Sequence, residues 1–142
     1  MPMVGLFDQT INLMQKVMDL RLENQQTIAS NVANADTPGY TPSHLEFEQQ
    51  LQQALTEEQA QPAAETSTNP AFFPIAGEGG IAAVQPKVVK EAGQSQSGDG
   101  NGVAVDQEMV DLAKNEILYE AATKVLSKKF GLLKYVVQEG KG

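Results

Sequence analysis

The sequence contains no cysteine and no tryptophan, and only 6% of its 142 residues are aromatic. Without cysteine there can be no disulfide framework, no thiolate metal site and no cysteine nucleophile. Aromatic side chains supply much of the buried area in small domains. A chain of this length with so few of them is therefore not expected to bury a large core by itself.

The charge and the hydropathy pattern argue against two further classes of protein. A formal net charge of −8 repels nucleic acid phosphates and anionic lipid headgroups, so neither is expected as the main partner. No apolar run approaches the roughly 20 residues that span a bilayer, so no transmembrane segment is expected. The residues after Met1 lack the basic start of a secretory signal peptide, and any export should use a route without a cleaved signal.

The segment 3–40 is predicted to form one long helix that ends in a sharp turn. No proline or glycine interrupts residues 6–32, and apolar side chains recur there at helical spacings. A second apolar row lies beside the first, so the apolar surface of the front half of the helix is wider than a single coiled-coil seam. We expect the main row to pack against other subunits. It consists of Phe7, Ile11, Met14, Met18, Ile28 and Val32.

The residues after this helix predict a chain reversal and then a shorter helix within 41–58. Pro38 disfavours the helical conformation at Thr37, and a glycine directly after proline suits the second central position of a type II turn. Ser43 and Glu46 have the spacing of a capping box, which places the start of the short helix at Ser43. One narrow apolar stripe on this helix consists of Phe47, Leu51 and Leu55.

The middle segment 59–102 is predicted to be irregular and flexible, because it collects four prolines and most of the glycines. Two apolar stretches within it, 71–75 and 87–90, are compatible with short strands or with anchoring loops. Their length does not decide between the two. The glycine-rich stretch 98–102 is expected to be a loop.

The segment 103–142 predicts a final long helix. Asp106 suits its N-cap, and the acidic residues of the first turns and the lysines further on match the helix dipole. Apolar residues form a heptad-like seam with a second row beside it. We expect this seam to pack against other subunits. Its residues are Met109, Leu112, Tyr119, Leu126, Phe130, Leu133 and Val137.

Together these elements predict a mainly α fold in which the long terminal helices pair in a coiled-coil-like manner. Each large apolar side chain left in water represents roughly 1.5–3 kcal/mol of drive to associate. We therefore expect a structural assembly subunit. One alternative is a monomeric helical domain completed by the middle segment, although its polar composition poorly offsets the entropy of ordering. Another is a helical adaptor that binds one target in a discrete complex.

No residue pattern indicates catalysis, a cofactor or a metal. His44 is the one histidine, and it is expected to face solvent because no second histidine or cysteine accompanies it. The adjacent acids Glu57 and Glu58 point to different sides of a helix. Ser30 and Ser43 have no positioned base. An enzyme is accordingly not expected.

The segment 30–40, which reads Ser-Asn-Val-Ala-Asn-Ala-Asp-Thr-Pro-Gly-Tyr, closely resembles the N-terminal signature of the bacterial flagellar rod and hook proteins. The short chain and its ending, 115–133, look most like the proximal rod members of that family. The residues that we assign to the signature turn are Ser30, Asn31, Asn34, Asp36, Thr37, Pro38, Gly39 and Tyr40.

This resemblance implies a subunit of the flagellar basal body whose paired terminal helices form the inner layer of an axial tube. Such a rod is a drive shaft that transmits torque, and it forms part of the wall of the export channel. The implied partners are other copies, other proximal rod proteins, and adaptor and export-gate proteins at the inner-membrane ring. The implied place is the periplasmic side of that membrane, reached by flagellar type III export without a cleaved signal peptide.

Two expectations about mechanism follow. Asn31, Asn34 and Thr37 should hydrogen-bond backbone at the helix end, while Tyr40 anchors the turn by packing. The terminal helices should be poorly ordered in the free subunit and should fold when neighbouring subunits supply the missing faces.

Overall fold

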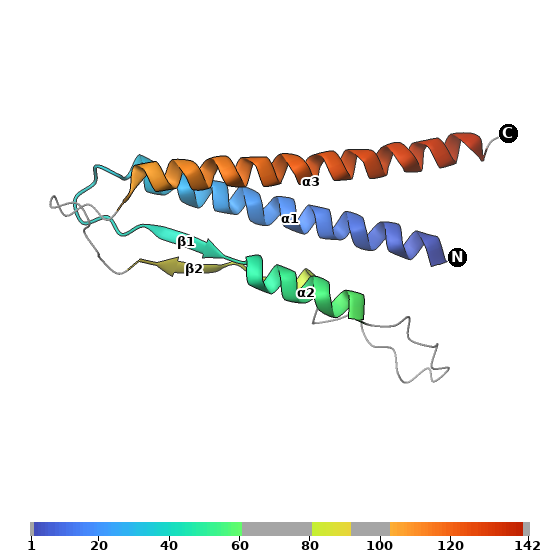
Figure 1. Cartoon of the computed structure of the whole chain (residues 1–142), viewed down its shortest axis with the longest axis horizontal. Helices are drawn as coiled ribbons and strands as arrows, with labels where there is room; N and C mark the ends of the chain where they lie inside the picture. The colour runs from blue at the N-terminus through green and yellow to red at the C-terminus, as the bar shows by residue number, and fades with distance from the viewer. Residues whose placement is uncertain (1, 61–80, 92–102, 141–142) are drawn as a thin grey trace. The chain divides into compact units, whose positions relative to one another are not determined.

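The computed structural model describes residues 2–60, 81–91 and 103–140 (Figure 1). The predicted strand or loop at 71–75 and the predicted loop at 98–102 lie outside these residues. The chain divides into two compact units. The first contains residues 1–45 and 88–142, and the second contains residues 46–87.

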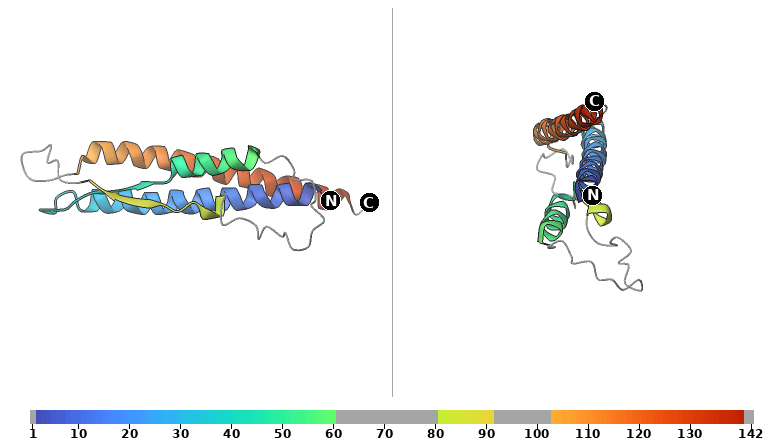
Figure 2. Two further views of the ribbon diagram at one scale, coloured as in Figure 1. Left: turned by 90° about the horizontal axis from the view of Figure 1, so that it is seen from below. Right: turned by 90° about the vertical axis from the view of Figure 1, so that its right-hand side faces the viewer.

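The first unit is built on two long helices. Helix α1 spans Pro2–Ala33 and helix α3 spans Val105–Glu139. They pack along each other and run in opposite directions, so that the start of α1 and the end of α3 lie at the same end of the pair (Figures 1 and 2). This arrangement confirms the predicted mainly α fold with paired terminal helices.

The turn after α1 also confirms the prediction. Gly39 has φ of +75°, as the second central position of a type II turn requires, and the Tyr40 amide donates to the Thr37 carbonyl oxygen at 3.2 Å. A non-glycine side chain at this position would be strained. Glycine is therefore the residue that lets the chain reverse here.

Two short strands pair with each other, and all but one residue of each strand belong to the first unit. Strand β1 spans Ser43–Glu46 and pairs with strand β2, Lys87–Lys90. The arrows of the two strands point in opposite directions in Figure 1. Next to this pairing, the Glu91 amide donates to the Pro42 carbonyl oxygen at 3.0 Å. Residues 87–90 therefore form a short strand, one of the two predicted alternatives, and not an anchoring loop.

The second unit contains helix α2, Glu48–Ala60, and a 3₁₀ turn, Ile81–Ala83, which contact each other. Its buried apolar residues are Phe47, Leu51, Ala54 and Val84. The predicted stripe is thus right for its first two members, while Leu55 is only half-buried.

The prediction that the short helix begins at Ser43 is wrong, because Ser43–Glu46 form β1 and α2 begins at Glu48. The reason is tertiary. The backbone amide and carbonyl of Ser43 both bond to the Asn31 side chain, and these contacts hold the residue in an extended conformation. The Leu51 amide bonds to the Phe47 carbonyl oxygen at 2.9 Å instead, so Phe47 occupies the place where the helix starts.

Two details of α3 also differ from the prediction. Ala104 occupies its N-cap, without a side-chain bond, and Asp106 lies inside the first turn. No lysine lies in the last turn, which ends at Glu139. The lysines therefore do not match the negative end of the helix dipole, whose effect is confined to the last turn. None of the described helices is both long and apolar enough to cross a bilayer.

Candidate functional site: a buried polar cluster around Asn31

Asn31 lies near the end of α1 and its side chain is completely buried, with 0% of the residue exposed. Its amide nitrogen donates to the Ser43 carbonyl oxygen at 2.8 Å and to Glu108 Oε2 at 3.1 Å. Its amide oxygen accepts from the Tyr40 hydroxyl and the Ser43 backbone amide, both at 3.1 Å. Two donors and two acceptor positions are the full capacity of an asparagine side chain. One side chain thus joins α1, the turn, β1 and α3.

Glu108 brings a carboxylate into the same buried place. It lies in the first turn of α3 and is only 3% exposed. The positive end of the helix dipole favours a negative charge there, and buried carboxylates need partners. The Asn31 amide supplies one at 3.1 Å, and His44 Nε2 lies 3.8 Å from the other carboxylate oxygen.

His44 extends the cluster toward the surface. Its Nε2 atom also lies 3.2 Å from Glu91 Oε1, and one third of its side chain is exposed. The prediction that His44 faces solvent is therefore wrong. Its partners come from parts of the chain more than 40 residues away, where sequence spacing gives no signal. We call Asn31, Tyr40, Ser43, His44 and Glu108 the Asn31 cluster.

The rest of the signature turn is held by local hydrogen bonds. The Asn34 amide nitrogen donates to the Ser30 carbonyl oxygen at 2.8 Å, and the Thr37 amide donates to the Asn34 carbonyl oxygen at 2.9 Å. The Thr37 hydroxyl lies 3.4 Å from Asn34 Oδ1. Asn34 thus bonds helix-end backbone as expected, whereas the Thr37 hydroxyl contacts a side chain and Asn31 bonds the backbone of β1 instead. Tyr40 differs from the expectation, because its hydroxyl bonds to Asn31 in addition to any packing of the ring.

Asp36 and Pro38, the remaining residues of the signature, are exposed. Pro38 acts through its backbone in the turn, and no described contact of the Asp36 side chain explains its place in the signature.

A second polar layer crosses the helix pair two turns from the Asn31 cluster. The Asn115 amide nitrogen donates to the Arg21 carbonyl oxygen at 2.7 Å, and Asn115 Oδ1 accepts from the Asn24 amide nitrogen at 3.1 Å. Asn115 is 2% exposed and Arg21 is 8% exposed. We call Arg21, Asn24 and Asn115 the Asn115 layer. It joins α1 directly to α3 by side-chain hydrogen bonds.

The predicted packing residues divide into three groups by exposure. Ile28 is buried, and Met109, Phe130 and Val137 are exposed by 50%, 50% and 64%. The side chain of Phe7 lies outside the described part of the chain. Those that are half-buried are Ile11, Met14, Met18, Val32, Leu112, Tyr119, Leu126 and Leu133.

The face of α3 that packs against α1 only partly coincides with the predicted seam. Its buried residues are Glu108, Asn115 and Ala122, none of which belongs to the predicted seam, and Glu108 directly precedes the seam residue Met109. The intermediate positions, Leu112 and Tyr119, belong to both patterns. Sequence reasoning missed Glu108 and Asn115 because it followed hydrophobicity. The signal that could have found them is their exact heptad spacing from Ala122.

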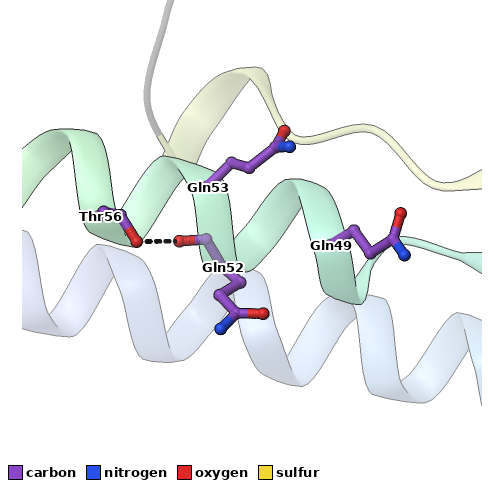
Figure 3. A pocket seen from close by; sticks show the side chains of 4 residues that line it. All are labelled: Gln49, Gln52, Gln53 and Thr56. Atoms are coloured by element: carbon purple, nitrogen blue, oxygen red, sulfur yellow. Dashed lines mark hydrogen bonds between the residues drawn. The ribbon is translucent and has the colours of Figure 1, made fainter.

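Nothing in the described part of the chain indicates a reactive centre. No group of three or more histidine, aspartate or glutamate side chains there is arranged to hold a metal ion. A shallow surface depression lies along α2, lined by Gln49, Gln52, Gln53 and Thr56 (Figure 3). The four side chains are exposed, and the Thr56 hydroxyl is already bonded to the Gln52 carbonyl oxygen at 2.9 Å. Exposed amides of this kind supply neither a nucleophile nor a base.

The fold is that of a helical protein whose long terminal helices are joined near the turn by a buried asparagine. The family model for flagella basal body rod proteins matches residues 18–41, which include Asn31 and the turn. The flagellar basal body rod protein FlgB of Bacillus subtilis is 30% identical over 138 residues, covering 97% of this chain and all of the relative. FlgB of Salmonella typhimurium is 27% identical over 140 residues, covering 97% and 99% of the two chains.

A third relative, FlgB of Borrelia hermsii, is 27% identical over 135 residues, covering 95% of this chain and all of the relative. Since the likeness extends over nearly the whole length, the chain belongs to the FlgB family of flagellar basal body rod proteins. It is a structural component of the rod, located in the flagellar basal body, and it assembles with other rod components.

Proposed function

We propose that this chain is a subunit of the proximal rod, which transmits torque from the motor and forms part of the wall of the export channel. The observation that carries the proposal is the combination of a rigidly joined helix pair with large apolar side chains left outside it. The pair is joined by the Asn31 cluster and the Asn115 layer. The large apolar side chains more than half exposed along α3 include Ile117, Leu132, Tyr135, Val136 and Val137.

Exposed apolar side chains on this scale favour association. At roughly 1.5–3 kcal/mol for each large side chain that becomes fully buried, several such contacts per subunit can hold a continuous shaft together. The predicted packing faces of α1 and α3 are proposed to meet neighbouring subunits. Torque would then pass through many repeated helix contacts rather than through any single group.

The proposed partners are other copies of this chain and other proximal rod proteins. At the base of the rod we place adaptor and export-gate proteins of the inner-membrane ring. We place the subunit on the periplasmic side of that membrane, reached by type III export without a cleaved signal peptide. No catalytic role is proposed, because the Asn31 side chain uses its full hydrogen-bonding capacity in holding the fold.

Folding on assembly is proposed for one half of the helix pair in particular. The two polar layers tie α1 to α3 near the turn, whereas no residue of α3 beyond Ala122 is buried within the described part of the chain. The far half therefore lacks contacts that would offset the entropy of ordering. Neighbouring subunits would supply these contacts in the rod.

Hydrogen exchange on the free subunit at low concentration tests this division. We expect backbone amides of residues 108–115 to be protected at least about 100-fold more strongly than those of residues 125–139, because the latter open locally at little free-energy cost. Comparable strong protection of both segments would mean that the far half is already folded, and it would contradict folding on assembly.

The pair Glu120–Lys124 reports on helix formation at the boundary between the two halves. Lys124 Nζ lies 2.8 Å from Glu120 Oε1. The hydrogen bond from Lys124, and then its positive charge, lower the pKa of Glu120 below the ordinary value of 4.5. A lowered pKa in the folded state means that the contribution to stability is present above pH 4.5 and is lost as the pH falls through the folded-state pKa.

We expect the Glu120 carboxyl to titrate below pH 4.5 by NMR wherever the helix is formed. Lys124→Gln should return the midpoint toward the ordinary value, while Lys114→Gln, which leaves Glu120 untouched, should not move it. An unchanged midpoint in Lys124→Gln would show that the pair is absent in solution.

Electron microscopy of native basal bodies separates the proposed function from an adaptor. A rod subunit joins an open, helically repeating assembly through heterologous contacts, whereas an adaptor forms a discrete complex. We expect density for the antiparallel α1–α3 pair, repeated around the rod axis. Finding the chain only in a discrete complex outside the rod would refute the proposal.

A further inference from the structure

The charges of α3 are sorted along its length. Residues 105–119 carry four acidic side chains and one lysine, whereas residues 120–139 carry four lysines and two acidic side chains. We call these segments the acidic half and the basic half of α3. Within the acidic half Glu108 is buried in the Asn31 cluster, while Asp106 and Glu116 are exposed and available to a neighbour.

The helix's own dipole does not explain the position of the lysines. A cation interacts with the dipole mainly within the last turn, and the last turn of α3 contains no basic residue. Lys124 is engaged by Glu120. Lys128 and Lys134 are exposed, and no salt bridge joins either of them to another described residue.

Both halves also expose large apolar side chains beside these charges. In the acidic half Met109 and Ile117 are 50% and 65% exposed. In the basic half Phe130 and Leu132 are 50% and 57% exposed. A partner for the basic half should therefore be a helix with exposed apolar side chains and acidic neighbours. The acidic half of α3 in another copy has this composition.

We propose that the basic half of α3 in one copy docks against the acidic half of α3 in the next copy. The two α3 helices run parallel and are displaced along their axis by about half their length, roughly 26 Å at 1.5 Å per residue. This inference rests on the proposed function as a rod subunit, and it adds which surface of which partner is used. The two surfaces differ, so the contact does not close on itself and it can repeat into an open assembly.

Charge reversal gives a test with a built-in rescue. One variant, Lys128→Glu with Lys134→Glu, makes both halves acidic. The other, Asp106→Lys with Glu116→Lys, makes both halves basic. Each variant alone should repel its own copies. In a mixture, residues 120–139 of the first variant, now acidic, face residues 105–119 of the second variant, now basic. The other contact, between residues 120–139 of the second variant and residues 105–119 of the first, is the same as in the parent chain.

We expect each variant, as the sole copy in the cell, to lower the number of completed basal bodies and swimming by about tenfold, as loss of complementary charge across an interface does. Producing both variants in one cell, or all four substitutions in one chain, should restore both readouts. Circular dichroism of each purified chain checks that the helix content is retained. Lys87→Glu with Lys90→Glu, which makes the same change in net charge on β2, should leave swimming unchanged.

Normal swimming of the two charge-reversed variants would overturn the proposal. So would a loss that neither co-production nor the four-substitution chain repairs, since that result assigns the lysines to a partner other than a copy of this chain. Both results would leave the rod function standing, because that function is tested separately by locating the chain in native basal bodies and by removing the chain.

Discussion

Asn31→Ala is expected to lower the free energy of unfolding by about 4 kcal/mol, because it removes four hydrogen bonds from a fully buried place. The substitution leaves the Ser43 backbone amide, the Ser43 carbonyl and one oxygen of the buried Glu108 carboxylate without their Asn31 partner, while the Tyr40 hydroxyl keeps only its 3.4 Å contact with the Ser30 hydroxyl. Each buried polar group left unpaired costs about 1–3 kcal/mol, and more for a charged one. Against a total stability of about 10 kcal/mol for a chain of this size, the loss is severe. Urea unfolding followed by circular dichroism measures it.

Two further substitutions show whether the hydrogen bonds are responsible. Asn12 is an exposed asparagine on the same helix, and Asn12→Ala should change the stability by no more than about 0.5 kcal/mol. Asn31→Asp keeps the shape of the side chain but replaces its two N–H donors by an oxygen that faces Glu108, so it should destabilise nearly as much as Asn31→Ala. A cost below about 1 kcal/mol for both Asn31 substitutions would show that the cluster does not hold the helix pair together.

Asn115→Ala should lower the free energy of unfolding by about 2–3 kcal/mol. It removes the bonds to the Arg21 carbonyl oxygen and to the Asn24 amide, and it leaves a small cavity in the helix interface. The Arg21 carbonyl retains its place in the helix ladder, which is why we expect a smaller effect than at Asn31. The adjacent Glu116 is exposed, and Glu116→Ala is the matched control, with little expected change in urea unfolding.

Asn115→Leu distinguishes stability from specificity at the same position. A buried asparagine in a helix interface fixes the register at a cost in stability, and replacing buried polar groups by well-packed apolar ones is often neutral or stabilising. We expect Asn115→Leu to unfold at a urea concentration at least equal to that of Asn115→Ala, with broadened NMR signals around Leu20 and Ala122. Sharp signals identical to those of the parent chain would show that Asn115 has no part in setting the register.

The features predicted best from sequence were those determined by local chemistry. The run without proline or glycine up to Val32 specified α1, and the Pro38-Gly39 pair specified the turn, because each constrains its own backbone dihedrals. The paired terminal helices followed from their apolar spacing. The hydrogen bonds within the turn could likewise be predicted from the sequence, because Asn34 and Thr37 bond to residues within four positions of themselves.

What sequence reasoning missed was determined by contacts between distant residues. Ser43 has a capping-box partner in Glu46, but the Asn31 side chain holds its backbone as a strand. The inward face of α3 includes Glu108 and Asn115. A search for apolar residues passed over both of them and selected Met109, the neighbour of Glu108, which is 50% exposed. Polar residues are favourable in an interface only when they have partners there, and the partners of Glu108 and Asn115 are more than 60 residues away in the sequence.

Removal of residues 106–142 from the chromosomal gene tests the central claim most directly. Helix α3 is needed both to close the subunit around Asn31 and to join it to its neighbours. Cells that produce the shortened chain are therefore expected not to swim and to contain no completed basal bodies, and the full-length gene should restore both. Intact rods and normal swimming with the shortened chain would contradict it.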